Sequence, residues 1–418
     1  TVRYSSTGFV FNTVAQVGVT VDLQSGTGTD NWGFADSFTN IEAAIGTNLG
    51  DDLTGKVIGN GLLSILRGLA GNDTIRGIDA DTAFLITADY REDPGAVRVN
   101  LSGAAETLGG LLIAAGTARD GFGGTDSFDK LRSILGSTSG DTILGSSLAD
   151  RLYGWSGNDD LRGGGGDDVI AGGLGSDTYD GGDGYDLIQF VNLSGIEAVP
   201  TQGAIASLLT GLIANDGYGN AESIQGGATN TIEMLVGTSF NDDLTGKVIT
   251  ELNADGVRQQ SYLRGNQGAD MIRGIAGEGR WISADHRRDA DANVDGFGVT
   301  VNLVTQTAID GWGNTDTLFD IGSARGSDFA DSLTGDDGDN WFRGQAGADV
   351  IIGGLGTDYL SHGDSTGSVI LDLQAGTVTD DGWGSADSAT GFEQAGGGSG
   401  DDTLLGSKAA NLLQGFAG

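Results

Sequence analysis

The sequence contains no cysteine and only two prolines among its 418 residues. Without cysteine, the chain has neither a disulfide framework nor a thiolate metal site. Basic residues are also scarce, because 21 Lys and Arg stand against 58 Asp and Glu and leave a net charge of −37. A surface with that charge repels nucleic acid and anionic lipid and attracts cations. Since no apolar stretch approaches the ~20 residues of a membrane span, we expect neither a nucleic-acid partner nor membrane insertion.

Residues typical of catalysis are few. The sequence has no HExxH zinc motif, and its only histidines are His286 and His362. The segment GDSTG (363–367) fits the nucleophile pattern G-x-S-x-G by letter, but no helical pattern follows it. Close carboxylate pairs leave glycoside hydrolysis open by residue type, yet the aspartates follow a regular repeat that a catalytic pair should break. We therefore expect no enzymatic activity.

Glycine and aspartate are the residues the chain has in excess. There are 77 glycines, and only nine of the 58 acidic residues are glutamate. Aspartate suits turns and short-reach metal coordination, whereas glutamate favours helices. This composition indicates a chain rich in turns and poor in helix.

These two residues recur in a nonapeptide with Gly at the first place, Asp at the sixth and an apolar residue at the eighth. Six such nonapeptides run unbroken over 136–189, and four cover 326–361, one of them with Asn340 at its sixth place. Single copies occur elsewhere. The candidate metal ligands are the sixth-place aspartates of the full matches: Asp51, Asp73, Asp141, Asp150, Asp159, Asp168, Asp177, Asp186, Asp242, Asp270, Asp331, Asp349, Asp358 and Asp402.

The letters of one nonapeptide predict its structure. Glycine permits positive φ and a tight turn, and the apolar eighth residue would lie in a very short strand facing a core. Such strands are stable only when coils stack at ~4.8 Å and pair their backbones. Two nonapeptides per coil would give two parallel ladders and two columns of turns. Stacked carboxylates repel unless cations lie between them, and Ca²⁺ prefers all-oxygen ligands. A metal-free polar solenoid with Gly/Asp turns is the alternative.

The tandem copies GGGGDDVIA and GGLGSDTYD resemble the repeats of RTX (hemolysin-type calcium-binding) proteins, whose pattern is G-G-x-G-x-D-x-U-x. The resemblance implies an all-β fold, a parallel β-roll or β-solenoid with Ca²⁺ bound in its turns. It also implies type I secretion and folding outside the cell on meeting calcium. Spacers between repeat blocks are similar to those of large RTX surface proteins.

A second motif, D-x-aromatic-G-x-x-acid, marks five spacers: DNWGFAD (30–36), DGFGGTD (120–126), DGYGNAE (216–222), DGWGNTD (310–316) and DGWGSAD (381–387). Short strand signals precede them at 19–23, 97–101, 190–193, 299–303 and 369–373. The aromatic residues either plug the interior of a wider spacer coil or form exposed platforms for sugar rings. The paired acids bind a further cation or cap turns. Segments 109–120 and 206–216 are expected as side loops or short helices, and Asp93 as a solvated spacer charge.

These motifs divide the chain into five units that each pair a spacer with nonapeptides. Their expected bounds are 1–85, 86–189 with the six-nonapeptide block, 190–282, 283–361 with the four-nonapeptide block, and 362–418. Because the sequence begins in a spacer and ends within a repeat, we expect it to be a section of a longer protein.

Two functions fit these observations. The first is a calcium-binding extracellular structural protein, such as a surface layer, filament or adhesin rod, that self-associates or binds other surface proteins or polysaccharide. The second is the calcium-binding portion of a type I-secreted enzyme or toxin whose catalytic domain lies elsewhere. Regular spacers favour the first, at a bacterial cell surface.

Overall fold

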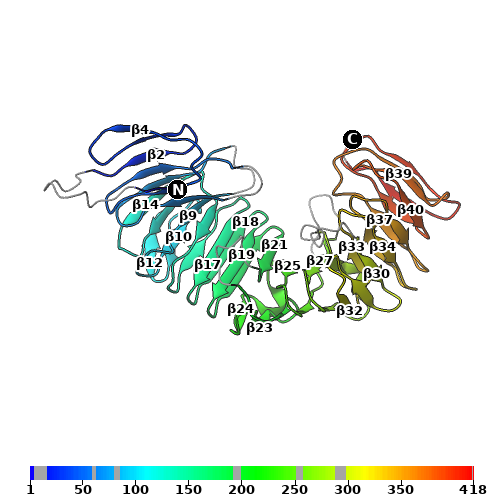
Figure 1. Ribbon diagram of the computed structural model, residues 1–418. Coiled ribbons are helices and arrows are strands. Elements are labelled where there is room, and N and C mark those ends of the chain that lie inside the picture. The colour runs from blue at the N-terminus through cyan, green and yellow to red at the C-terminus, as the bar shows by residue number, and fades with distance from the viewer. Residues whose placement is uncertain are drawn as a thin grey trace. The chain divides into compact units, whose positions relative to one another are not determined.

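The computed structural model describes residues 1–3, 17–58, 63–79, 85–191, 199–250, 258–287, 298–416 and 418. They form two compact units (Figure 1). The first holds the described residues of 1–189 and 220–232, and the second those of 190–191, 199–219 and 233–418. The described residues contain no α-helix, only β-strands and the two 3-10 turns η1 (Gly227–Thr229) and η2 (Gly279–Trp281). None of their helices is therefore long and apolar enough to span a membrane.

The six-nonapeptide run folds as predicted, with one strand per nonapeptide. Its strands are β16 (Thr142–Leu144), β17 (Arg151–Ser156), β18 (Asp160–Gly165), β19 (Val169–Leu174), β20 (Thr178–Asp183) and β21 (Asp186–Gln189). Strand β17 pairs in parallel with β19, and β18 with β20, so strands alternate between two sheets. Leu152 lies beside Ile170 and Leu161 beside Tyr179, an offset of two nonapeptides. Two nonapeptides thus make one coil, which confirms the parallel β-roll.

The same two ladders extend through each unit. One ladder of the first unit holds β1 (Val2–Arg3), β5 (Ala43–Ile45), β7 (Ser64–Arg67), β9 (Ile86–Asp89), β15 (Ser133–Leu135), β17, β19 and β21. Its counterpart in the second unit holds β25 (Ile232–Val236), β27 (Ser261–Arg264), β29 (Ile282–Asp285), β33 (Ser323–Arg325), β35 (Trp341–Arg343), β37 (Tyr359–Ser361), β41 (Gln394–Gly396) and β43 (Leu412–Gln414).

The other ladder carries the remaining single strands of the coils. In the first unit they are β6 (Asp52–Thr54), β8 (Thr74–Arg76), β16, β18, β20 and β24 (Glu222–Ile224). In the second unit they are β26 (Asp243–Thr245), β28 (Met271–Arg273), β34 (Ser332–Thr334), β36 (Val350–Ile352) and β42 (Thr403–Leu405).

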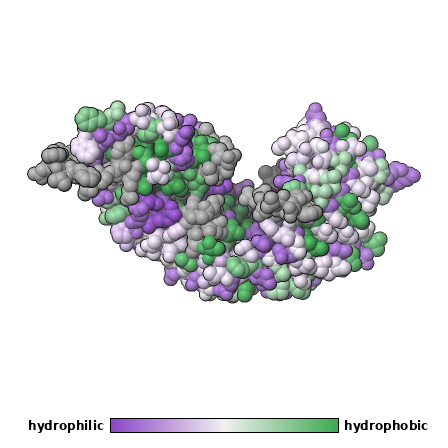
Figure 2. Space-filling model, viewed as in Figure 1, coloured by the Kyte–Doolittle hydropathy of each residue, from purple (hydrophilic) through white to green (hydrophobic). Residues whose placement is uncertain are grey.

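The core between the two ladders consists of the eighth-place side chains, and the ninth-place Leu135, Tyr153 and Ala171 form a second buried cluster. In the long run the eighth-place residues are at most 1% exposed: Ile143, Leu152, Leu161, Ile170, Tyr179 and Ile188. Burial of each contributes about 1.5–3 kcal/mol. Neighbouring residues of a strand point outward, since Ile351 is fully buried while Val350 and Ile352 are 48% and 41% exposed. On the face shown in Figure 2, hydrophobic residues are accordingly interspersed with hydrophilic ones.

The spacers fold as antiparallel meanders. They are not the wider coils that one interpretation of their aromatic residues required. In the second spacer, β10 (Arg98–Asn100), β13 (Thr117–Arg119) and β14 (Thr125–Asp129) pair in that order. Strand β14 also pairs in parallel with β8 of the preceding coil, and β10 with β16 of the following coil. The meander therefore inserts three strands into one ladder without interrupting it.

Three further spacers follow this plan in whole or in part. The first has β2 (Thr20–Asp22), β3 (Thr27–Thr29) and β4 (Ala35–Ser37). The fourth has β30 (Thr300–Asn302), β31 (Thr307–Ile309) and β32 (Thr315–Phe319). The fifth has β38 (Val369–Asp372), β39 (Thr377–Asp381) and β40 (Asp387–Thr390).

One prediction about the spacers is wrong, and another falls partly outside the described residues. Residues 190–191 are not in a strand, and residues 192–193 of the strand expected at 190–193 lie outside the described part of the chain. The first described strand of the third spacer is β22 (Ala204–Ser207). The segments expected as side loops or helices are extended: β12 (Leu111–Ile113) pairs with β11 (Glu106–Leu108), and β23 (Leu212–Asp216) pairs with β22. In β23 burial alternates, as strand pairing requires, whereas Leu111 and Leu112 of β12 are both exposed and only Ile113 is buried.

Candidate metal centres

Every predicted aspartate lies at the start of a strand, in a column of turns. All are at most 3% exposed except Asp402, which is half-buried. Each column is held by a repeated hydrogen bond, in which the main-chain N–H of one aspartate donates to Oδ1 of the aspartate one coil later. The N···O distance is 2.7 Å from Asp141 to Asp159 and 2.8 Å from Asp159 to Asp177. The structure therefore brings these residues together as ordered stacks.

The other predicted aspartates follow the same rule. The bond joins Asp168 to Asp186 at 2.9 Å, Asp51 to Asp73 at 2.8 Å, Asp242 to Asp270 at 2.8 Å and Asp331 to Asp349 at 2.9 Å. Asn340 donates in the same way to Asp358 at 2.7 Å, and Val369, at the start of a meander, donates to Asp402 at 2.8 Å.

The second carboxylate oxygen divides these aspartates into two groups. In the capped group, a serine or threonine four residues earlier donates to the carboxylate. Ser137 donates its hydroxyl to Oδ1 of Asp141 at 2.8 Å and its N–H to Oδ2 at 2.6 Å. The capped group is Asp51, Asp141, Asp150, Asp242 and Asp331, with Thr47, Ser137, Ser146, Thr238 and Ser327 as caps.

In the open group, Oδ2 is buried without a hydrogen-bond partner. Its members are Asp73, Asp159, Asp168, Asp270, Asp349, Asp358 and Asp402. The turn before Asp168 shows why: Gly164 and Gly166 have left-handed φ values of 101° and 91°, and no hydroxyl stands at the capping place. The turns before Asp177 and Asp186 share this backbone, with Gly173 at 94° and Gly182 at 100°. Among the capped group, Asp150 also keeps one open oxygen, Oδ1.

The first glycine of each turn brings backbone oxygens close to the open carboxylate. A Cβ on Gly163 would lie 2.1 Å from Oδ2 of Asp168 and 2.4 Å from the carbonyl oxygen of Gly181, one coil later. Gly154 stands in the same relation to Asp159 and the carbonyl of Gly172, at 2.2 and 2.6 Å. Glycine is required here because any side chain would occupy the space between the carboxylate and the next coil's carbonyl.

The columns are electrostatically unfavourable for bare carboxylates. Burial, followed by the charges of Asp186, Asp150 and Asp167, raises the pKa of Asp168 to about 8. Burial raises the pKa of Asp159 to about 8 as well, with Asp177 and Asp141 adding to the effect. A divalent cation beside these oxygens would remove the penalty.

The donor set fits calcium. Open carboxylate oxygens and nearby carbonyl oxygens are hard ligands, and Ca²⁺ takes six to eight of them in flexible geometry. Among the residues the structure describes, no three acidic or histidine side chains converge as a metal cluster. A bound ion would therefore take much of its coordination from the backbone, as these turns provide.

Sequence reasoning missed a set of residues in the columns. The last acid of the spacer motif occupies the sixth-place position, because Asp126, Asp316 and Asp387 accept the N–H of Asp73, Asp270 and Asp349, each at 2.9 Å. The sequence does contain a signal, because the spacer motif pairs two acids. What it lacked was their register with the nonapeptides.

Two spacer predictions need correction. Asp93 is not solvated: it is 3% exposed, it accepts the N–H of Gly121 at 2.8 Å, and burial raises its pKa to about 7. None of the five spacer aromatics is buried in the core. Trp32, Phe122 and Trp383 are 49%, 43% and 37% exposed, while Tyr218 and Trp312 are half-buried. The meander places them at turn tips, outside the space between the ladders.

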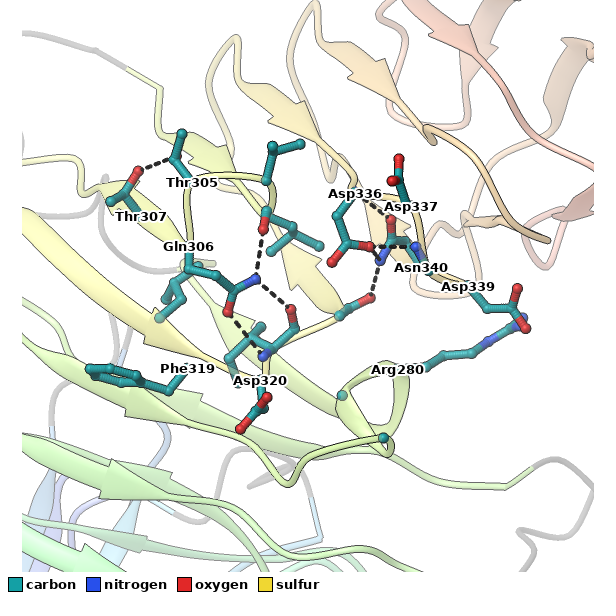
Figure 3. A pocket seen from close by; sticks show the side chains of 18 of the residues that line it. Arg280, Thr305, Gln306, Thr307, Phe319, Asp320, Asp336, Asp337, Asp339 and Asn340 are labelled. Atoms are coloured by element: carbon teal, nitrogen blue, oxygen red, sulfur yellow. Dashed lines mark hydrogen bonds and ion pairs between the residues drawn. The ribbon is translucent and has the colours of Figure 1, made fainter.

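A cavity of about 1100 Å³ lies in the second unit beside the nonapeptide that carries Asn340 (Figure 3). Asn340 Nδ2 donates to Oδ1 of Asp336 at 3.1 Å, and the N–H of Asp336 donates back to Oδ1 of Asn340 at 2.8 Å. A guanidinium nitrogen of Arg280, Nη1, lies 3.6 Å from Oδ2 of Asp339. Because an amide replaces the sixth-place carboxylate and is satisfied by its own turn, this turn offers no open carboxylate oxygen.

Comparison with known proteins agrees with this geometry. The family model described as the RTX calcium-binding nonapeptide repeat (4 copies) matches residues 59–77, 135–170, 156–188, 325–360 and 396–418. Asp51, Asp242 and Asp270 lie outside these ranges, but they directly precede the ladder strands β6, β26 and β28 in the same way as most of the matched aspartates precede theirs. No curated protein matches the chain. The chain therefore contains calcium-binding nonapeptide repeats of the RTX kind in these ranges.

Proposed function

We propose that this chain is a secreted structural protein of the bacterial cell surface, belonging to a surface layer, filament or adhesin, whose folding and assembly depend on Ca²⁺. The observation that carries the proposal is the open group of buried carboxylate oxygens, stacked coil upon coil without a protein donor. A buried polar atom without a partner costs about 1–3 kcal/mol, and more when charged. A counter-ion would remove this cost for a stack of ionised carboxylates.

We propose a narrower set of calcium ligands than the sequence predicts. We assign calcium to the turns that end at Asp73, Asp159, Asp168, Asp177, Asp186, Asp270, Asp349 and Asp358, where the second and fourth places have left-handed φ. The hydroxyl caps of Asp51, Asp141, Asp242 and Asp331 satisfy both oxygens in place of an ion. Asp150 and Asp402 each keep an open oxygen but lack the left-handed turn.

The regular alternation of meanders and runs supports the structural role. The second, fourth and fifth meanders join the ladder on both sides, so these spacers continue the roll. The exposed spacer aromatics also favour contact with polysaccharide, because an exposed ring presents a stacking face to a sugar. The alternative function, the calcium-binding portion of a secreted enzyme or toxin, requires a catalytic domain elsewhere in a longer chain.

Circular dichroism during chelation tests the calcium dependence. Without calcium, the net charge of −37 opposes compaction, whereas bound ions stabilise the native state by mass action. We expect the β spectrum to be lost in excess EGTA and regained on adding Ca²⁺, with Mg²⁺ at equal concentration as the control. A β spectrum retained in excess chelator would contradict the proposal.

A further inference from the structure

We propose that the spacer turns 120–126 and 381–387 each complete a cation site with the nonapeptide turn of the preceding coil, 68–73 and 344–349 respectively. The inference rests on the proposed calcium binding of the nonapeptides and extends it to turns outside the family match. Each spacer turn would supply the half-site that another nonapeptide supplies inside a run.

The ladder places the spacer turn where the next coil's turn would lie. Strand β14 pairs in parallel with β8, and β40 with β36, in the register of successive coils. Asp126 accepts the N–H of Asp73, and Asp387 that of Asp349, as Asp168 does for Asp150. The nonapeptide that precedes each of these spacers in its ladder therefore faces an aspartate-bearing turn.

The first acid of the spacer motif adds a carboxylate with an open oxygen. Asp381 is fully buried; its Oδ1 accepts the N–H groups of Trp383 and Ser385 at 2.8 and 2.9 Å, and its Oδ2 has no partner. Asp120, 3% exposed, accepts the N–H of Gly124 with Oδ1 and also leaves Oδ2 without a partner.

That open oxygen faces the preceding nonapeptide turn. A Cβ on Gly124 would lie 2.6 Å from Oδ2 of Asp120 and 1.6 Å from the carbonyl oxygen of Gly71, which belongs to the turn 68–73. The same turn ends at Asp73, whose own Oδ2 is open. Asp120 Oδ2 and the Gly71 carbonyl oxygen thus lie close together, in contact with the turn whose last residue, Asp73, is itself open, and a cation would relieve the repulsion between these acids.

Both proposed sites carry an aspartate whose pKa is raised by the neighbouring spacer acids. Burial, followed by the charges of Asp126, Asp51 and Asp120, raises the pKa of Asp73 to about 9. Burial and the charges of Asp331, Asp387 and Asp381 raise that of Asp349 to about 9. In both cases, the two acids of the spacer motif act on the final aspartate of the preceding turn.

The fourth spacer shows how an amide can replace the ion. Asp310 accepts the N–H groups of Trp312 and Asn314 through Oδ1 at 3.0 and 2.7 Å, the backbone arrangement of Asp381. Its Oδ2, however, accepts Asn314 Nδ2–H at 2.9 Å. Gly124 and Ser385 stand at the place of Asn314 and offer no amide. The site is therefore open in the second and fifth spacers and closed at Asp310 in the fourth.

Exchange of this one residue tests the inference. We would count Ca²⁺ bound per chain, by equilibrium dialysis with atomic emission, for the wild type, Ser385→Asn, Asn314→Ser and the exposed control Ser368→Asn. We expect Ser385→Asn to bind one ion fewer, Asn314→Ser to bind one more, and the control to match the wild type. Circular dichroism at saturating calcium verifies folding of each chain.

The outcomes separate this inference from the proposed function. Unchanged counts in Ser385→Asn and Asn314→Ser, with calcium still bound by the wild type, would overturn the spacer sites alone. A wild type that binds no calcium would overturn the proposed function itself. If Ser385→Asn does not fold, the calcium count of Asn314→Ser tests the inference instead. This variant removes the amide that caps Asp310 Oδ2.

Discussion

The main-chain N–H of Asp150 donates a hydrogen bond to Oδ1 of Asp168, one coil further along the chain, at 2.7 Å. This bond fixes the carboxylate and leaves Oδ2 directed into a buried space without a donor. Since Asp168 repeats the bond to Asp186 at 2.9 Å, each coil positions the carboxylate of the next. The backbone thus preorganises the column, and predictions for single residues follow from the place of each in it.

Removal of an open carboxylate should weaken calcium binding and stability together. Asp168→Ala deletes a proposed ligand and also leaves the N–H of Asp150 without its acceptor, a loss of about 1–3 kcal/mol before any loss of metal. We expect weaker binding by calorimetry and a lower Tm at matched calcium. Asp337→Ala, at an exposed residue, is the control and should stay within about 0.5 kcal/mol of the wild type. Equal Tm shifts in both variants would contradict the assignment.

Removal of a hydroxyl cap should cost stability without changing calcium stoichiometry. Ser137→Ala deletes the 2.8 Å hydrogen bond to the buried carboxylate of Asp141, which should cost about 1.5–3 kcal/mol. Urea unfolding at saturating calcium measures the loss, and equilibrium dialysis counts the ions. A variant that loses one bound ion would show that Asp141 is a ligand after all.

A methyl group at the first glycine of a turn should close its site. In Gly163→Ala, the added Cβ would stand 2.1 Å from Oδ2 of Asp168, so the carboxylate or the coil must shift. We expect a loss of several degrees in Tm and one fewer bound calcium. Gly103→Ala is a matched control, because its Cβ would meet no atom within 4 Å and the residue is exposed. Comparable behaviour of the two variants would refute the steric argument.

The calcium-free protein should be most stable in acid. The pKa of Asp168 and Asp270 is raised from 3.8 to about 8 in the folded state, and that of Asp73 and Asp349 to about 9. A raised pKa means that the folded state binds protons more tightly, so this contribution is complete below about pH 4 and disappears as pH rises toward 9. We expect calcium-stripped protein to gain β structure by circular dichroism between pH 8 and pH 5. A loss of β structure over that interval would oppose the pKa argument.

Calcium should also promote assembly. Few basic residues exist to neutralise a neighbouring acidic chain, 21 against 58 acids, so side-by-side contact needs divalent ions between carboxylates. We expect millimolar Ca²⁺ to produce ordered self-association that chelation reverses, seen by light scattering and electron microscopy. A folded, calcium-loaded protein that stays monomeric at high concentration would favour the repeat portion of an enzyme or toxin.

The sequence by itself determined the parallel β-roll fold and the kind of metal, calcium, that its aspartate repeats bind. A nine-residue period places one apolar side chain per short strand in the core between the ladders, and two such strands per coil follow from the need to close that core. The identity of Asp168 and its equivalents as column residues follows from the same period, because the sixth place always falls at the start of a strand.

Only the tertiary structure decided which carboxylates are open and how the spacers fit. Ser137 and Gly164 occupy the same place in their nonapeptides, yet one satisfies an aspartate and the other leaves it open, because that outcome depends on turn conformation. The meander could not be predicted either, since its third strand pairs with a coil some fifty residues earlier: Ser127 lies beside Thr74. Local patterns encode turns and burial, but pairing between distant strands is set by the stacking of the coils, and that register placed Asp126, Asp316 and Asp387 in the columns.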